Sequence, residues 1–136
     1  MLRFPRELLE RMVAHCLDGY PLEACGLIAG GDDGGVATVR ALFPADNAAR
    51  SARVYEVSPR DMLRADREAE GAVASLIGVY HSHTHTEAKP SPTDVRQAPD
   101  PDWHYVLVSL RDSHPSVRSW TIREGRMSEE EVHLQW

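Results

Sequence analysis

The spacing of apolar positions along the chain predicts two amphipathic helices. Across residues 5–18, apolar side chains recur every three or four residues, with Pro5 in the first turn and Gly19 after the end. A second helix is predicted to begin after Ser58 as N-cap, with Pro59 at its first position. The apolar faces expected to pack on a sheet are Leu8, Leu9, Met12, Val13, Cys16 and Leu17 in the first helix, and Met62, Leu63, Ala65, Ala69 and Val73 in the second.

Short apolar runs between turn residues predict the strands of that sheet. Residues 25–30 and 36–43 flank an Asp-Asp-Gly-Gly turn and predict a hairpin, and residues 54–57 predict a brief strand. Residues 76–80 are apolar almost throughout, as in a strand covered on both faces. Later elements are expected as one or two helical turns at 95–98, a strand at 103–110, an edge or half-exposed strand at 117–122 and a last strand at 132–136.

This order of elements predicts an α/β (α+β) fold with one mixed sheet and helices packed on it. The chain has 136 residues, a length that suits one domain with one hydrophobic core, so we expect a single domain over residues 1–136.

The polarity changes abruptly at the end of the apolar run 76–80. Side chains two apart on a strand point to the same face, so His81 and His83 can converge on one ion while Ser82 faces away. The prolines that follow end the strand, and a turn or helix start could bring Asp94 back beside the two imidazoles. Two nitrogens and one carboxylate oxygen leave a fourth position open, which is typical of a catalytic zinc site.

The combined pattern resembles the JAMM (MPN+) metallopeptidase family. Its parts are His81-x-His83, ten intervening residues and Asp94, with Ser91 three before the aspartate and Glu23 upstream. The segment Pro-Leu-Glu-Ala-Cys-Gly-Leu-Ile-Ala-Gly around Glu23 is similar to the one that carries the family's catalytic glutamate. The resemblance covers nearly the whole chain and implies a curved sheet flanked by helices in the deaminase-like style.

The resemblance also implies a role for each residue of the pattern. His81, His83 and Asp94 would bind one Zn²⁺, whose water becomes acidic enough to attack an amide carbonyl near neutral pH. Glu23 would take the proton of that water and pass it to the leaving amine, and Ser91 would donate a hydrogen bond to the oxyanion.

Within the family, the chain looks closest to the small stand-alone bacterial enzymes that process ubiquitin-like sulfur-carrier proteins of the ThiS/MoaD type. The expected function is a zinc-dependent metallopeptidase or isopeptidase that removes C-terminal residues, or an attached amino acid such as cysteine, from the carrier tail. The alternatives are a non-catalytic MPN-type protein-binding module and a zinc hydrolase of a small amide. A nucleobase substrate is disfavoured because the deaminase signature, His-x-Glu with a later Pro-Cys-x-x-Cys, is absent from the sequence.

Two residues near the pattern allow other interpretations. His85 continues the alternation of His81 and His83, so it is either a third histidine ligand or, as we expect, a solvent-facing or substrate-side residue. Cys25 lies two residues after Glu23 and could be a thiolate nucleophile, although a small packing residue is the simpler interpretation. Thr84 stands where many family members have proline.

Composition narrows the setting of the protein. The net charge is −6 and Lys89 is the single lysine, which argues against a nucleic-acid partner. No apolar run is long enough for a signal peptide or a membrane span, and two cysteines are too few for a disulfide framework. We therefore expect a cytoplasmic protein with reduced thiols and no membrane contact, of open oligomeric state.

Overall fold

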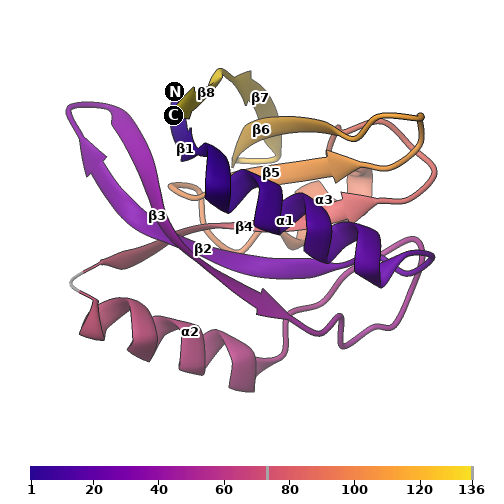
Figure 1. Cartoon of the computed structure of the whole chain (residues 1–136), viewed down its shortest axis with the longest axis horizontal. Helices are drawn as coiled ribbons and strands as arrows, with labels where there is room; N and C mark the ends of the chain where they lie inside the picture. The colour runs from indigo at the N-terminus through magenta and orange to yellow at the C-terminus, as the bar shows by residue number, and fades with distance from the viewer. Residues whose placement is uncertain (73, 136) are drawn as a thin grey trace.

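The structure is a computed structural model that describes residues 1–72 and 74–135 (Figure 1). The elements are β1 (Leu2–Pro5), α1 (Arg6–Gly19), β2 (Cys25–Asp33), β3 (Val36–Ala45), α2 (Pro59–Gly71), β4 (Ser75–His83), α3 (Pro92–Gln97), β5 (His104–Ser109), β6 (Ser116–Arg123), β7 (Arg126–Glu130) and β8 (Val132–Gln135). Within the described residues, the strands form one mixed sheet in the order β7-β6-β5-β4-β2-β3-β1-β8. The expected α+β fold, with a curved sheet and flanking helices, is confirmed.

The centre of the sheet is β4, which pairs antiparallel with β2 and parallel with β5. A parallel pair needs a crossover connection, because the chain must return to the same end of the sheet before the next strand begins. The crossover between β4 and β5 contains a loop and α3. The segment after His83 is therefore held beside the end of β4.

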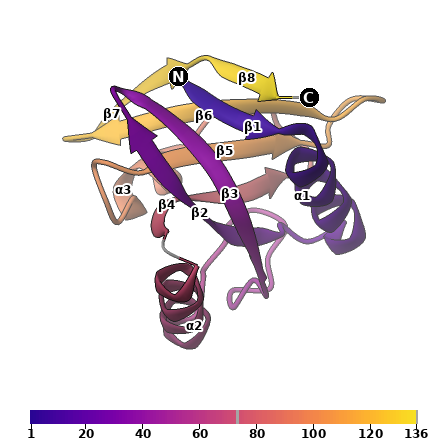
Figure 2. The ribbon, with the colours of Figure 1, turned by 60° about the vertical axis from the view of Figure 1, so that its left-hand side comes forward.

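The two faces of the sheet carry separate hydrophobic clusters, as the period-two alternation of strand side chains requires. Ile28 and Tyr80 point to the face where α1 contributes Met12 and Cys16. The opposite face contains Leu27, Val79, Tyr105, Leu107 and Trp120, and α2 contributes Ala65. Figures 1 and 2 show α1 and α2 lying apart on different sides of the sheet. His81 follows Val79 on the α2 face, whereas Ser82 follows Tyr80 on the α1 face.

The C-terminal strands connect the two ends of the sheet (Figure 2). Strand β7 pairs antiparallel with β6 at one end, and β8 pairs parallel with β1 at the other. Glu131 lies between these consecutive strands, and its carbonyl oxygen accepts a hydrogen bond of 2.9 Å from the amide of Leu2. The sheet therefore curls until its ends meet.

Several expectations about individual elements are wrong. Residues 54–57 form no strand: they contribute an isolated bridge between Asn47 and Val57, because Asn47 organises this segment as a loop. The segment 117–122 is not at an edge of the sheet, because β7 pairs with β6, whereas its mixture of buried and partly buried residues fits the alternative of a half-exposed strand. Strands β1 and β7 were not predicted.

Helix boundaries and faces also differ in detail. Helix α3 begins at Pro92 rather than Val95, and Leu17 and Leu63 are about half exposed, at 52% and 51%, rather than packed on the sheet. Val73 and Trp136, which we expected in the second helix and the last strand, lie outside the described residues. No helix in the described part of the chain is both long and apolar enough to span a membrane.

Candidate metal centre

The end of β4 brings two buried histidines to one point. His81 and His83 are exposed by 1% and 5%, and their Nε2 atoms lie 3.3 Å apart. Between them Ser82 faces the other side of the sheet, where its hydroxyl accepts a hydrogen bond of 2.9 Å from the amide of Ala24. The alternation expected from the sequence is therefore present, and the strand holds both imidazoles rigidly.

Asp94 reaches the same point from the first turn of α3. Ser91 caps this helix: its hydroxyl accepts a hydrogen bond from the Asp94 amide, while its own amide donates to Asp94 Oδ2 over 2.8 Å. This reciprocal capping box fixes the carboxylate. Asp94 Oδ2 lies 3.2 Å from His81 Nε2 and 3.1 Å from His83 Nε2.

The three atoms fit one tetrahedral ion. Ligands bound at about 2.0–2.1 Å with tetrahedral angles lie about 3.3–3.4 Å from one another, close to the distances between these atoms.

The hydrogen bonds of His83 also call for a positive charge between its Nε2 atom and Asp94. His83 Nδ1 lies 2.8 Å from the carbonyl oxygen of Glu87, which can only accept, so Nδ1 carries a proton. In a neutral ring, His83 Nε2 would then face the Asp94 carboxylate with a lone pair, which is favourable only with an added proton or a cation between them.

Burial and pairing set the protonation of His81 and Asp94 in the direction that a metal requires. His83 differs: burial lowers its pKa, but hydrogen bonds with Asp94 and with the Glu87 carbonyl raise it overall, so a bound metal would have to displace a proton from this imidazole. Burial lowers the pKa of His81, so its imidazole is neutral and can bind a metal. Burial opposes ionisation of Asp94, yet hydrogen bonds from His81 and His83 and from the Ser91 amide hold its pKa well below the usual range. Asp94 is therefore a carboxylate throughout the physiological range.

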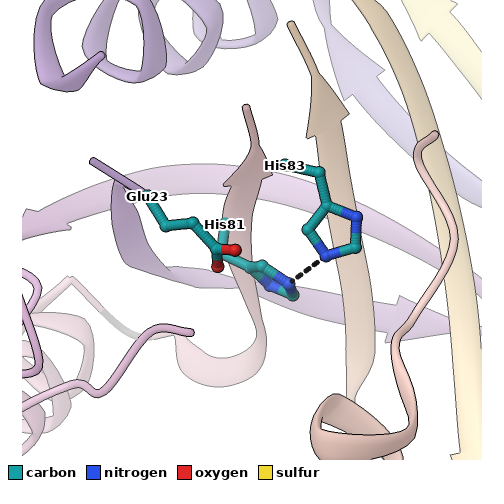
Figure 3. A group of neighbouring side chains, drawn as sticks. All are labelled: Glu23, His81 and His83. Carbon is teal, nitrogen blue, oxygen red and sulfur yellow. Dashed lines mark hydrogen bonds between the residues drawn. The ribbon is translucent and has the colours of Figure 1, made fainter. Parts of the chain in front are cut away.

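Glu23 lies in the segment before β2 and points toward the two imidazoles (Figure 3). One carboxylate oxygen of Glu23 and one nitrogen of each histidine lie within 4.8 Å of one another, so this group could hold a metal ion. Glu23 is 4% exposed, and its Oε1 has no hydrogen-bond partner within the described part of the chain. Burial raises the pKa of Glu23 to about 7, with Asp94 adding to the shift and His83 opposing it. Such a carboxyl group can exchange a proton near neutral pH.

Ser91 lines a cavity of about 580 Å³ together with Glu23, His83 and His85. Because the Ser91 oxygen accepts from the Asp94 amide, its proton is free to donate to another group. The helix-cap role and a role facing the cavity are therefore compatible.

Tyr55 is part of the site although no sequence pattern indicated it. Its ring stacks on the His81 imidazole, with the centroids 4.0 Å apart and the planes at 20°. Tyr55 lies in the loop that we expected to be a strand, so its position depends on tertiary contacts rather than on local periodicity. An aromatic residue in a loop otherwise rich in polar and small residues is the one signal that could have indicated it.

His85 and Cys25, which allowed other interpretations, lie outside the group formed by Glu23, His81, His83 and Asp94. His85 is exposed and lines the cavity, and its Nδ1 lies 2.7 Å from the hydroxyl of Thr84, which agrees with the expected substrate-side position. Cys25 is fully buried, and burial raises the pKa of its thiol to about 12, so no thiolate forms near neutral pH. The packing interpretation of Cys25 therefore holds.

The fold and this arrangement of residues agree with the family to which the chain belongs. Residues 5–123 match the family described as prokaryotic homologs of the JAB domain, and the chain is a member of that family. The expected membership of the JAB/MPN family is confirmed.

Three named relatives resemble most of the chain. A CysO-cysteine peptidase of Mycobacterium tuberculosis is 43% identical over 129 residues, which cover 94% of this chain and 87% of the relative. A desampylase of Haloferax volcanii is 33% identical over 122 residues, 86% of each chain. A probable TtuB-protein conjugate cleaving protease of Thermus thermophilus is 36% identical over 127 residues, 93% of this chain and 79% of the relative.

Solved structures share the fold. A protein of Desulfitobacterium hafniense superposes with a TM-score of 0.92 at 33% identity, over 99% of this chain and 93% of that one. A JAB1/MPN domain protein from Archaeoglobus fulgidus has a TM-score of 0.63 at 19% identity, over 97% of each chain, a likeness that concerns the fold alone.

Proposed function

We propose that this protein is a zinc-dependent metallopeptidase that hydrolyses an amide bond at the C-terminal tail of a ubiquitin-like sulfur-carrier protein. Family membership supports the proposal, and so do the relatives, which are named as a peptidase, a desampylase and a conjugate-cleaving protease. The bond would join the tail to extra C-terminal residues or to an attached amino acid.

The two buried free thiols, Cys16 and Cys25, suit a reducing compartment, and we place the enzyme in the cytoplasm.

The observation that carries the proposal is the convergence of His81, His83 and Asp94, with Glu23 close to the two histidines. The three nearest atoms lie 3.1–3.3 Å from one another, whereas the Glu23 group is spread over distances of up to 4.8 Å. We assign the three closer residues as zinc ligands and leave Glu23 free for proton transfer. Zinc bound there would act as a Lewis acid on the scissile carbonyl and activate a water molecule.

The remaining chemistry belongs to side chains that face the cavity. Glu23 would accept a proton from the attacking water and return it to the leaving amine, because its raised pKa of about 7 allows both steps near neutral pH. Ser91 would donate its free proton to the oxygen that becomes negative during attack. Tyr55 would keep the His81 ring in place by stacking.

Metal content separates the proposed ligands from the proposed base. We expect about one zinc per chain in the wild-type protein and in Glu23→Gln, and little in His83→Ala or Asp94→Ala, measured by plasma mass spectrometry. Cleavage of a sulfur-carrier protein with a C-terminal extension should stop in His83→Ala, in Asp94→Ala and after chelation, and should be strongly reduced in Glu23→Gln. Loss of a general base costs about 10²- to 10⁴-fold in rate, so the kcat of Glu23→Gln should be lower than that of the wild type by a factor in that range. Equal metal content in all the variants would contradict the ligand assignment.

A further inference from the structure

We infer that Arg53 is a specificity-determining residue that binds the free α-carboxylate of the amino acid leaving the carrier tail. The inference rests on the proposed function, because it concerns which amide bonds the same site accepts. Through this contact, Arg53 would favour tails that carry an α-linked amino acid with a free carboxylate over tails linked to a lysine side chain.

Arg53 lies in the wall of the cavity that contains the proposed base. The cavity of about 580 Å³ is lined by Arg53 and His85 together with Glu23, His83 and Ser91. Among the described lining residues, Arg53 is the one lysine or arginine. Its guanidinium has no ion pair or hydrogen bond within residues 1–72 and 74–135, so it is free for an anionic ligand.

The backbone around Arg53 is fixed to both sides of the site. The carbonyl oxygen of Ser51 accepts a hydrogen bond of 2.8 Å from the Glu23 amide, and that of Ala52 accepts one of 3.3 Å from the Thr84 hydroxyl. The Arg53 amide donates to the Ser51 hydroxyl over 3.0 Å. The arginine therefore extends from a turn that is tied to the Glu23 segment and to the end of β4.

The side chain of Asn47 holds the same loop from within. Its amide nitrogen donates to the carbonyl oxygens of Glu23 and Val54 over 3.0 and 2.9 Å, and its oxygen accepts from the Glu56 amide over 2.9 Å. These contacts replace the pairing that a strand would have provided. The loop keeps a defined position relative to Glu23 without belonging to the sheet.

The charge of Arg53 fits one class of leaving group. In an α-linked adduct, the carboxylate is attached to the carbon next to the scissile nitrogen, so it enters the cavity together with the bond. A guanidinium binds a carboxylate through two parallel hydrogen bonds, a geometry that neither a carboxamide nor a lysine side chain offers. In a lysine isopeptide, several methylene groups separate the scissile nitrogen from the backbone, and no carboxylate lies at this position.

The test compares three substrates built on one ThiS/MoaD-type carrier. The first ends in Gly-Gly-Cys with a free carboxylate, the second ends in the corresponding carboxamide, and the third joins Gly-Gly to the side chain of a lysine peptide. For the wild type, kcat/KM should favour the carboxylate over the carboxamide, and Arg53→Ala should reduce that ratio by about 10- to 100-fold. Arg53→Lys should recover part of it, since a point charge remains.

Arg67→Ala is the matched control, because it removes the same charge from an exposed position on α2. It should keep the wild-type ratio. An unchanged ratio in Arg53→Ala, or an equal loss in Arg67→Ala, would overturn the inference.

Binding gives a second readout that does not require turnover. In the Glu23→Gln background, calorimetry should show tighter binding of the carboxylate tail than of the carboxamide tail, and adding Arg53→Ala should remove the difference. Equal binding of the two tails by Glu23→Gln, or no binding of either, would overturn the inference. If the wild type cleaves none of the three substrates, the proposed function fails, while the binding comparison still decides the role of Arg53.

Discussion

Ser91 combines two tasks in one side chain. Its oxygen accepts a hydrogen bond of 3.1 Å from the Asp94 amide as the cap of α3, and Ser91 also lines the cavity that Glu23 lines. A cap stabilises the helix, whereas a donor toward the cavity affects only the reaction. The two tasks can be separated because glycine is a better N-cap than alanine, although neither has a hydroxyl group.

Substitution of Ser91 should therefore change stability and turnover to different extents. We expect Ser91→Ala to lower the free energy of unfolding by about 0.5–2 kcal/mol and Ser91→Gly by only a few tenths. Both variants should lose about 10²- to 10³-fold in kcat, since neither can donate to the developing oxyanion. Urea unfolding and steady-state kinetics on the same preparations provide the check. Full activity in Ser91→Gly would limit Ser91 to capping.

The sequence predicted the proposed ligands more readily than the residues that surround them. Strand periodicity alone places His81 and His83 on one face, and the Ser-Pro-x-Asp order already suggests a helix start that returns Asp94 to them. Glu23 came from the family resemblance, because no local pattern relates it to β4. Tyr55 could not be predicted, since hydrogen bonds of Asn47 position its loop and these appear only in three dimensions.

At the scale of single elements, β4 depends on a residue without a side chain. A Cβ atom at Gly78 would lie 2.2 Å from the carbonyl oxygen of His104, on the neighbouring strand β5. That oxygen belongs to backbone and cannot turn away as a flexible side chain would. The close approach of β4 to β5 at this point therefore requires glycine three residues before His81.

Gly78→Ala should destabilise the protein by about 1–3 kcal/mol, because the strands must separate to admit a methyl group. Gly71→Ala is the control: among the described residues, and apart from its chain neighbours and the backbone of its own helix, no atom lies within 4 Å of its would-be Cβ, and the residue ends α2. Alanine there should be neutral or stabilising by up to about 1 kcal/mol. Midpoints of urea unfolding measure both. Equal midpoints for the two variants would show that the strands adjust without cost.

Strong local patterns predicted most elements, and the errors lie in segments whose secondary structure depends on contacts with residues distant in the sequence. The helix over residues 5–18 and the strand over 76–80 have clear periods, and both are present as α1 and β4. Strand β7 was missed because its residues alternate weakly and include charged side chains. It forms because β6 supplies an antiparallel partner that a sequence window cannot include.

At the scale of the whole molecule, a polar cluster around Glu130 connects the C-terminal strands to the rest of the sheet, close to where β7 ends and β8 begins. Glu130 accepts hydrogen bonds from the Ser119 hydroxyl and from His104 Nδ1, and the amino group of Met1 lies 3.6 Å away. Burial opposes ionisation of Glu130, but these partners lower its pKa below the ordinary value of 4.5. The carboxylate thus joins β5, β6 and the N-terminus at the junction.

The lowered pKa of Glu130 predicts a dependence of stability on pH. A group whose pKa is lower in the folded state stabilises the fold above its unfolded value and loses that effect as pH falls through the folded value. The difference in unfolding free energy between the wild type and Glu130→Gln should therefore be largest above about pH 5 and shrink in acid. Urea titrations at several pH values, with chelator present to remove any contribution from bound metal, provide the measurement. A difference that stays constant with pH would rule out this role of the Glu130 charge.

The pairing of β1 with β8 also determines how the chain resists mechanical force. The strands run parallel, with Leu2 beside Val132 and Pro5 beside Gln135, so Leu2 lies at one end of the pair and Gln135 at the other. Tension applied between residues 1 and 135 would slide the two strands along each other. The hydrogen bonds between the two strands would be loaded in shear and would break together, not one after another. The shear resistance of this pair therefore opposes any force that pulls the two ends of the described chain apart.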